Sequence, residues 1–239
     1  MLAIYKREMR GFFTTSIGYI FLACAIAISA AIFSIATIFS LTADTSVYFA
    51  GLILVLMIFL PILTMRSFSE EKKTKTEQLL LTSPVSTTQM VLGKFLSAFT
   101  MLGIFLALSL VFLIPLGIFV GEGASGPNAS LVIGNVIALL LVGMCFIAIG
   151  ILVSSLTENQ FAAIVITIVI LAAMFATNLF SGRIGSYAIR VILDWLSIFA
   201  RYQVFTYGFF DIGALFYYIS VAGVFIFLTV RVFEARKYK

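Results

Sequence analysis

The chain has 239 residues, of which 62% are hydrophobic and only 10% are charged, and its mean hydropathy is +1.19. An ordinary soluble domain has an apolar share of about one half, so this composition excludes a soluble protein and indicates an integral membrane protein. The apolar blocks lack the alternation of polar and apolar residues that a membrane β-barrel requires. An all-α membrane bundle is therefore expected.

The first segment, residues 1–14, predicts a helix of its own. Apolar residues recur there at helical spacing, namely Leu2, Tyr5, Met9 and Phe12. The basic residues of the segment fall largely on other faces, which is typical of an amphipathic helix lying in the membrane interface. A cluster of charges that serves only to orient the first span is the alternative.

Six apolar blocks are long enough to cross the roughly 30 Å hydrocarbon core as helices. The predicted spans lie near residues 18–40, 48–65, 95–119, 131–154, 161–180 and 212–232. The first block is too long for a signal-peptide core and lacks a small-residue cleavage pattern, so we expect it to remain as a span.

The longest polar stretch, SEEKKTKTEQLLLTSPVSTTQMVLGK, occupies residues 69–94, between the second and third blocks. Ser69, followed by two acidic residues, predicts the start of a helix, and Ser83-Pro84 predicts its end. A second helix is expected to begin at Ser86 or Thr87 and to run into the third span.

The leucines at 79–81 within this stretch would form an apolar patch if water surrounded them. Such a patch indicates a partner or the membrane surface. The alternative is a solvated hairpin that serves only the topology, since charged loops are usually just solvated.

Lys and Arg residues orient the predicted bundle. If the N-terminus is cytoplasmic, all of the 15 Lys and Arg residues except Arg183, Arg190 and Arg201 lie on the inner side. This asymmetry predicts that both termini and residues 66–94 are cytoplasmic and that residues 181–210 lie outside. It also explains the net charge of +5 without a nucleic-acid partner.

The outer connection contains a weak candidate for a gate, made of Arg190, Asp194, Trp195 and Arg201. Arg190 and Asp194 are four residues apart, as in a helical ion pair, within YAIRVILDWLSIF, which we expect to be the main amphipathic helix of this connection. The interpretation we favour for these residues is plainer: they anchor the chain at the level of the lipid headgroups.

Small residues predict close helix packing in two spans. They are Gly143, Gly150 and Ser154 in the fourth span and Ala23, Ala27, Ala30 and Ser34 in the first.

Catalytic chemistry finds no support in the sequence. The chain contains no histidine, which excludes haem ligation by His, His-based metal sites and Ser-His or Cys-His catalysis. No phosphate-binding glycine loop precedes Gly93-Lys94. The two cysteines, Cys24 and Cys145, lie in apolar blocks and are expected to be packing residues.

The polar stretch resembles a known family. Its acidic pair Glu70-Glu71, its run from Thr76 to Val85 and its pair Gly93-Lys94 are similar to the first cytoplasmic loop of ABC transporter permeases of the exporter-like type 2 class. In particular, the stretch is similar to the permeases associated with gliding motility and nitrous-oxide-reductase maturation. Where they have Gly-Thr, this chain has Lys75-Thr76. The amphipathic start, the six spans and the long outer segment fit the same class.

The resemblance implies one transmembrane permease domain over residues 1–239, with an interfacial helix at 1–14, a cytoplasmic coupling segment at 66–94 and outer re-entrant helices at 181–210. Such permeases pair as homodimers or related heterodimers and seat the coupling segment in a cleft of a separate ABC ATP-binding subunit. The implied coupling residues are Glu70, Glu71, Glu77, Gln78, Leu79, Leu80, Leu81 and Pro84. ATP and Mg would be bound by that partner, and this chain would bind no cofactor.

The expected function is that of a permease subunit without a catalytic site, in the plasma membrane of a bacterium. Its substrate would be amphipathic, peptide, lipid-like or drug-like, and membrane lipids would surround it. The alternative is a non-transporting scaffold or accessory subunit of an envelope complex. Whether an ATPase polypeptide accompanies the chain distinguishes the two.

Overall fold

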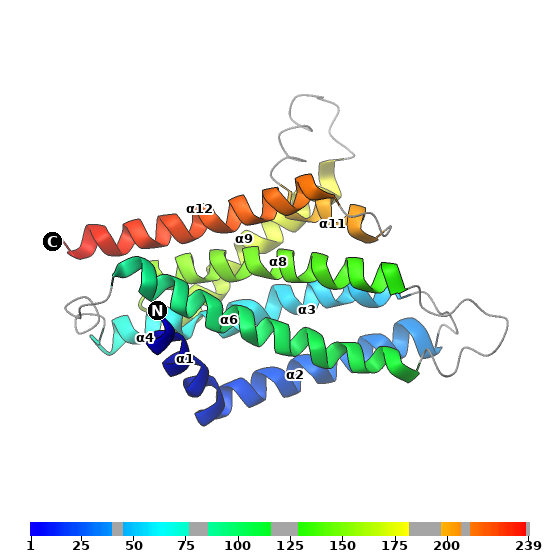
Figure 1. Ribbon diagram of the computed structural model, residues 1–239, viewed down its shortest axis with the longest axis horizontal. Coiled ribbons are helices and arrows are strands. Elements are labelled where there is room, and N and C mark those ends of the chain that lie inside the picture. The colour runs from blue at the N-terminus through cyan, green and yellow to red at the C-terminus, as the bar shows by residue number, and fades with distance from the viewer. Residues whose placement is uncertain (40–44, 77–85, 116–128, 182–196, 207–210, 238–239) are drawn as a thin grey trace.

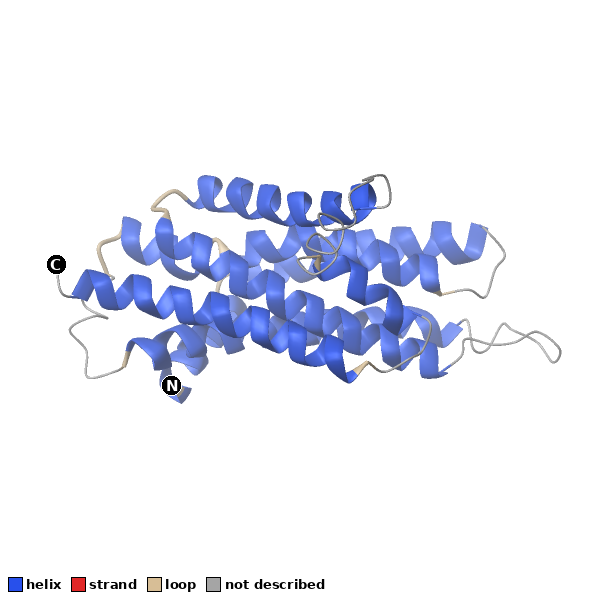
Figure 2. Cartoon of the chain, turned by 90° about the horizontal axis from the view of Figure 1, so that it is seen from above, coloured by secondary structure: helices blue, strands red, loops and turns tan. Residues whose placement is uncertain are grey.

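The computed structural model describes residues 1–39, 45–76, 86–115, 129–181, 197–206 and 211–237. Every regular element among them is helical, as predicted (Figure 2). The helices are α1 (Leu2–Thr14), α2 (Ser16–Phe33), the π-helix η1 (Ser34–Phe39), α3 (Ser46–Thr64), α4 (Arg66–Lys73), α6 (Thr87–Ser109), the 3-10 helix η2 (Leu110–Phe112), α8 (Ala129–Leu156), α9 (Gln160–Ser181), α11 (Ile198–Thr206) and α12 (Ile212–Lys237).

Six of the described helical stretches are long and apolar enough to cross a membrane, which confirms the predicted spans. They are Gly18–Thr37, Ser46–Lys73, Thr87–Pro115, Ala129–Leu156, Gln160–Thr177 and Ile212–Lys237. They run roughly along the long axis of the molecule (Figure 1). Large apolar side chains remain on their outward faces, as expected of helices that contact lipid, and the chain is a multi-pass membrane protein.

Helix α6 begins at Thr87, within the predicted polar stretch, rather than near residue 95. Ser86 caps it, because the Ser86 hydroxyl accepts a hydrogen bond of 3.3 Å from the backbone N–H of Gln89. The predicted re-entry into helix at Ser86 or Thr87 is confirmed. The third span therefore starts with a polar turn that continues into the apolar part of the same helix.

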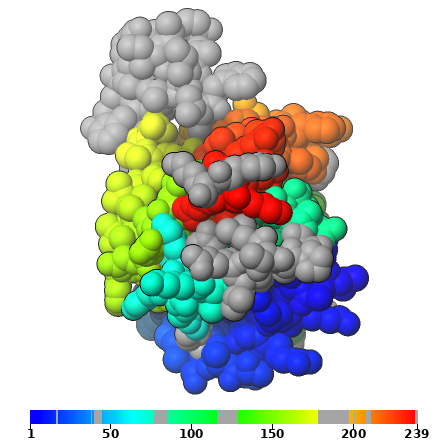
Figure 3. Space-filling model, turned by 90° about the vertical axis from the view of Figure 1, so that its left-hand side faces the viewer, coloured from blue at the N-terminus to red at the C-terminus, as the bar shows by residue number. Residues whose placement is uncertain are grey.

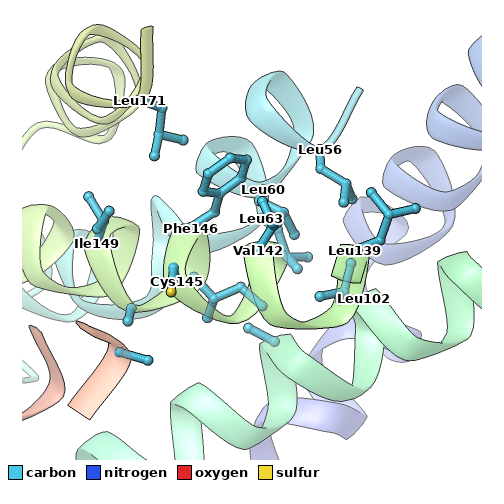
Figure 4. Close-up of a cluster of buried hydrophobic side chains, with 14 of the residues drawn as sticks. Leu56, Leu60, Leu63, Leu102, Leu139, Val142, Cys145, Phe146, Ile149 and Leu171 are labelled. Atoms are coloured by element: carbon cyan, nitrogen blue, oxygen red, sulfur yellow. The ribbon is translucent and has the colours of Figure 1, made fainter. Parts of the chain in front are cut away.

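Helix α8 is the centre of the bundle. It contacts α3, α6, α9, α11 and α12. Figure 4 shows Val142, Cys145 and Phe146 of α8 among leucines of the neighbouring helices. Cys145 is fully buried, as expected of a packing residue, whereas Cys24 lies on an exposed face.

Two glycines of α8 allow this close packing. A β-carbon at Gly143 would overlap the Leu102 side chain of α6, and one at Gly150 would overlap the Thr64 hydroxyl of α3. The predicted packing role of the small residues in the fourth span is confirmed.

The small residues of the first span behave differently. Ala23 and Ala27 lie on an exposed face of α2, while Phe21 and Ala25 of the same helix are buried. Within this chain the prediction of close packing through Ala23 and Ala27 is wrong. The other face of α2, with Phe21, Ala25 and Phe33, is buried against the bundle instead.

Candidate functional site

One end of the bundle carries the N-terminus, α4, the start of α6 and the C-terminal end of α12 (Figure 1). We call it the α4 end. Figure 3 looks onto it, with α1 in dark blue, α4 in cyan and the end of α12 in red. The predicted coupling segment belongs to this end, because α4 continues α3 after Met65 and α6 leads back into the membrane.

The first helix of the coupling segment has other bounds than predicted. Instead of running from Ser69 toward Pro84, α4 begins at Arg66 and ends at Lys73, and residues 74–76 form a turn. Lys75 in this turn has a φ of 59°, in the left-handed region that favours glycine. The departure from Gly-Thr at Lys75-Thr76 thus falls on a residue whose backbone adopts a conformation that glycine takes readily.

Ser69, the predicted helix start, lies inside α4 and is fully buried. The Ser154 hydroxyl of α8 accepts hydrogen bonds from the backbone N–H groups of Phe68 and Ser69, both at 3.1 Å. The same hydroxyl donates to the carbonyl of Met65 at 2.8 Å. One side chain of the central helix thus holds the junction between α3 and α4.

Lys94 of α6 is only 2% exposed. Its ammonium group donates to Glu8 Oε1 of α1 at 3.0 Å and to Glu71 Oε1 of α4 at 2.9 Å. It also donates to the carbonyl of Ser67 and lies 4.9 Å from the ring centre of Phe68. A charge this deep persists only when it is paired, and here two other helices supply the partners.

Arg7 of α1 completes what we call the charge cluster, made of Arg7, Glu8, Glu71 and Lys94. Its guanidinium donates to Glu8 Oε1 at 2.8 Å and to Glu71 Oε1 at 2.7 Å. Burial alone would raise the pKa of the Glu8 carboxyl, but Lys94 and Arg7 outweigh burial and hold this pKa below its ordinary value. Two cations and two carboxylates thereby balance, and they join α1, α4 and α6.

The outer side of α4 carries weaker ion pairs. Arg66 binds Glu70 through two hydrogen bonds of 2.6 and 2.9 Å, and the Glu70 side chain is 40% exposed. Lys72 lies 3.3 Å from Glu158, which is 68% exposed, beyond the end of α8. Exposed pairs of this kind contribute little to stability, so Glu70 remains accessible to a partner.

The predicted coupling residues therefore divide into three groups. Glu70 faces outward and Glu71 faces the interior of the bundle. The others lie outside the described residues, namely Glu77, Gln78, Leu79, Leu80, Leu81 and Pro84.

Of the four predicted gate residues, only Arg201 lies in the described part of the chain. It belongs to α11, and its guanidinium lies 3.9 Å from the ring centre of Tyr217 in α12. The other three, Arg190, Asp194 and Trp195, lie outside the described residues, as does most of the predicted amphipathic helix.

Helix α11 packs against α8 and α9 at the end opposite α4. The Tyr202 hydroxyl of α11 donates to Asn135 Oδ1 of α8 at 2.7 Å. The Tyr218 hydroxyl of α12 donates to the carbonyl of Ile198 at 2.7 Å. These bonds hold a short helix against the bundle, and its insertion into the membrane stays a prediction.

Sequence reasoning missed two features of the charge cluster. Glu8 received no role, although it is the single acid in an otherwise basic lead. Lys94 was interpreted only as part of the loop motif and as an inner positive charge, although it stands directly before an apolar block. An acid among bases and a Lys beside an apolar run were the available signals.

Residues 42–233 of the chain match the ABC-2 family transporter protein family. No curated protein matches the chain. The matched region runs from the start of the second span almost to the end of α12 and includes α4, Lys94 and α8. The narrower likeness to the gliding-motility and nitrous-oxide-reductase-maturation permeases stays a prediction. The chain belongs to the ABC-2 family of transporter proteins, whose membrane permeases work with an ATP-binding partner.

Proposed function

We propose that the chain is the permease subunit of an ATP-driven exporter, pairs with a second permease subunit and is driven through residues 66–94 by a separate ATP-binding subunit. The observation that carries this proposal is the position of Lys94. It lies on α6, at one flank of the segment, and binds Glu71 of α4, at the other flank. Both flanks are thereby fixed to each other.

A motor subunit can drive a membrane bundle only through an element that is continuous with the spans. Helix α4 follows α3 after one residue, Met65, and α6 is a single helix from Thr87 into the membrane. The Ser154 hydroxyl ties α4 to the central helix α8. A force on the segment between the flanks would therefore reach the core, where it shifts a conformational equilibrium if the two states differ in their contacts.

The contacts with the ATP-binding subunit would come from the segment between the two flanks. Leu79, Leu80 and Leu81 would supply apolar anchors, which dominate binding energy in most interfaces. Glu70, Glu77 and Gln78 would supply polar contacts around them, and Pro84 would set the angle at which the chain turns toward α6. Glu71 has a different role in this proposal, because it holds the segment in place from inside.

The basic residues support one orientation in the membrane. The α4 end carries the basic N-terminal helix and the basic last turn of α12, with Arg236 and Lys237. We place this end, with both termini, on the cytoplasmic side of a bacterial plasma membrane. ATP and Mg would be bound by the partner, the substrate would be amphipathic, and α1 would lie in the inner interface.

Co-purification in mild detergent tests the proposal. The unaltered chain should retain an ATP-binding polypeptide, identified by mass spectrometry, and Leu79→Glu/Leu80→Glu should release it while insertion and permease pairing persist. Leu156→Glu is the matched control, since this leucine at the same end is 54% exposed and lies outside the segment.

Two results would contradict the proposal in different ways. If no ATP-binding polypeptide accompanied the unaltered chain, the scaffold or accessory function would be favoured. If the double variant retained the ATPase and its nucleotide-dependent activity, the segment would be only a solvated connector.

A further inference from the structure

A pocket of about 810 Å³ opens on the side of the bundle between α2, α3, α9 and α11. Its volume lies within the roughly 300–1,000 Å³ typical of small-molecule sites. It is distant from the charge cluster, because its lining begins at Ser46, the first residue of α3, whereas Glu71 lies beyond the other end of that helix.

The deep walls of the pocket are apolar. Ile53 of α3, Phe175 of α9 and Phe199 of α11 lie there, and none of the described lining residues carries a charge. Gly51 lets α2 and α3 approach closely at the pocket, since a β-carbon at this position would lie 2.6 Å from Cγ2 of Ile32 in α2. The described walls therefore suit a hydrocarbon group, and none of their residues offers an ion pair.

The α3 wall is polar only at its shallow end. Ser46 starts the helix, and Leu54 lies eight residues further, or about 12 Å along the axis at 1.5 Å per residue. Between them the pocket is lined by Val47, Ala50, Gly51 and Ile53.

The α11 wall shows the same gradient. Tyr202 binds Asn135, near the start of α8, whereas the Phe199 ring lies 5.8 Å from that of Phe146, much farther along α8. Helix α11 thus rises from Phe199 at depth toward its polar lining residues, Gln203 and Thr206. Both walls place hydroxyl or amide groups at the shallow end and hydrocarbon below.

The mouth of the pocket faces the bilayer. Val47 is 60% exposed and Leu54 is 48% exposed, and both lie on a membrane-spanning helix. Lipid, not water, surrounds these side chains at the level of the spans. A ligand entering here would come sideways from the hydrocarbon.

We propose that this pocket binds one acyl chain of a membrane lipid, with the polar region of the lipid beside Ser46, Gln203 and Thr206. This lipid would belong to the outer leaflet, because the pocket lies toward the end of the bundle opposite α4. The choice of leaflet rests on the proposed function, which places the α4 end inside. Because the described part of the lining carries no charge, the site recognises the chain and the uncharged glycerol-ester region, and it does not select the headgroup. The substrate class thereby narrows to lipids and lipid-like amphiphiles.

Photo-crosslinking in proteoliposomes tests this site with the unaltered protein. The probes are phosphatidylethanolamine and phosphatidylglycerol that carry a diazirine near the end of one acyl chain or near the glycerol. Ile53 and Phe199 are decisive, since they are only 5% and 4% exposed and lipids that merely surround the bundle would not reach them. The deep diazirine should label these two residues, and the shallow one should label Gln203 and Thr206.

Variants then test whether labelling depends on the pocket. Ala50→Trp fills it and should lower labelling of Phe199 severalfold, whereas Ile58→Trp should not, because Ile58 is an exposed residue of the same helix that does not line the pocket. Labelling of the exposed α12 residue Phe227 should stay constant and serves as the internal reference.

Several outcomes would overturn the proposal. They are absence of label at Ile53 and Phe199, equal labelling of Ala50→Trp and the unaltered protein, or a reversed order of deep and shallow labels. A change of oligomeric mass in Ala50→Trp without loss of label would mean that a second copy covers the pocket. Two measurements separate failure of this site from failure of the proposed function. Probe lipid confined to one leaflet of sealed vesicles tests the site and its leaflet. Retention of the ATPase, measured in parallel, tests the proposed function.

Discussion

Lys94 Nζ and Glu71 Oε1 lie 2.9 Å apart although they stand on opposite sides of the predicted coupling segment. Glu8 accepts from the same ammonium group at 3.0 Å across 86 residues of sequence. The site is therefore a junction of three helices, and α1 takes part in it as an internal partner through Arg7 and Glu8. Substitutions in this junction should therefore change the stability of the protein.

Lys94→Met should destabilise the protein by about 3 kcal/mol, because it leaves two largely buried carboxylates with only Arg7 as a counter-ion. Lys72→Met is the matched control, since the Lys72–Glu158 pair is exposed and should contribute less than about 1 kcal/mol. Unfolding in mixed detergent micelles, followed by circular dichroism, measures both. Equal losses for the two variants would show that burial of Lys94 has no energetic consequence.

Acid should weaken the contribution of Glu8. Its pKa is lower in the folded protein than the ordinary value of 4.5. The stabilisation is therefore fully present above that value and is lost as the pH falls through the lowered pKa. The difference in unfolding free energy between the unaltered protein and Glu8→Gln should shrink as the pH falls from neutral toward about 3. A difference that grew with acid would show that the carboxylate is not the stabilised form.

Lys75→Gly should stabilise the end of α4 by about 1 kcal/mol, because glycine adopts the left-handed conformation without steric cost. Lys73→Gly removes the same charge two residues earlier, from the last helical position, and should cost about 1 kcal/mol. Hydrogen exchange of the α4 amides, read by mass spectrometry, should therefore slow in the first variant and accelerate in the second. If the exchange rate changed in the same direction in both variants, charge and not backbone conformation would control this turn.

Gly150→Ala should separate α3 from α8 and cost about 1–3 kcal/mol, since the new methyl group would overlap the Thr64 hydroxyl. Gly103→Ala on α6 is the control, because nothing lies within 4 Å of a β-carbon there. It should be neutral or slightly stabilising, as alanine is the better helix former. Thermal unfolding midpoints compare the two variants. An unchanged midpoint for Gly150→Ala would refute the close approach of α3 and α8 at this crossing.

The six spans could be predicted because a run of about 20 apolar residues identifies a membrane helix without reference to its neighbours. The central position of α8 could not, since α2 is equally apolar on all sides and differs only in what packs against it. This is also why the prediction of close packing was right for Gly150 and wrong for Ala23. Both lie in small-residue patterns, but only Gly150 faces another helix of this chain.

The candidate site was predictable in its position and not in its contacts. The polar stretch and its likeness to the ABC-2 permeases drew attention to Lys94 and predicted a helix after the second span, although α4 runs from Arg66 to Lys73 and does not begin at Ser69. The pairing of Lys94 with Glu8 depends on the tertiary fold, because no local pattern links residues on separate helices. The turn at Lys75 was missed because the sequence around it contains neither Gly nor Pro, so only backbone conformation reveals it.

A triple variant separates folding from coupling. Lys94→Met/Glu8→Gln/Glu71→Gln removes both carboxylates together with their buried cation and leaves only Arg7, whose side chain is 50% exposed. Replacing buried ionic groups together by uncharged ones is often nearly neutral for stability. The unfolding free energy should therefore recover most of what Lys94→Met alone loses. If the cluster positions the coupling segment, this variant should still retain the ATP-binding subunit but show reduced nucleotide-dependent transport, because α4, α6 and α1 are no longer fixed to one another. Transport by reconstituted vesicles, measured together with ATPase retention, provides the readout. Full transport in the triple variant would assign Lys94 to folding alone and leave the proposed contacts of residues 77–85 as the whole of the coupling device.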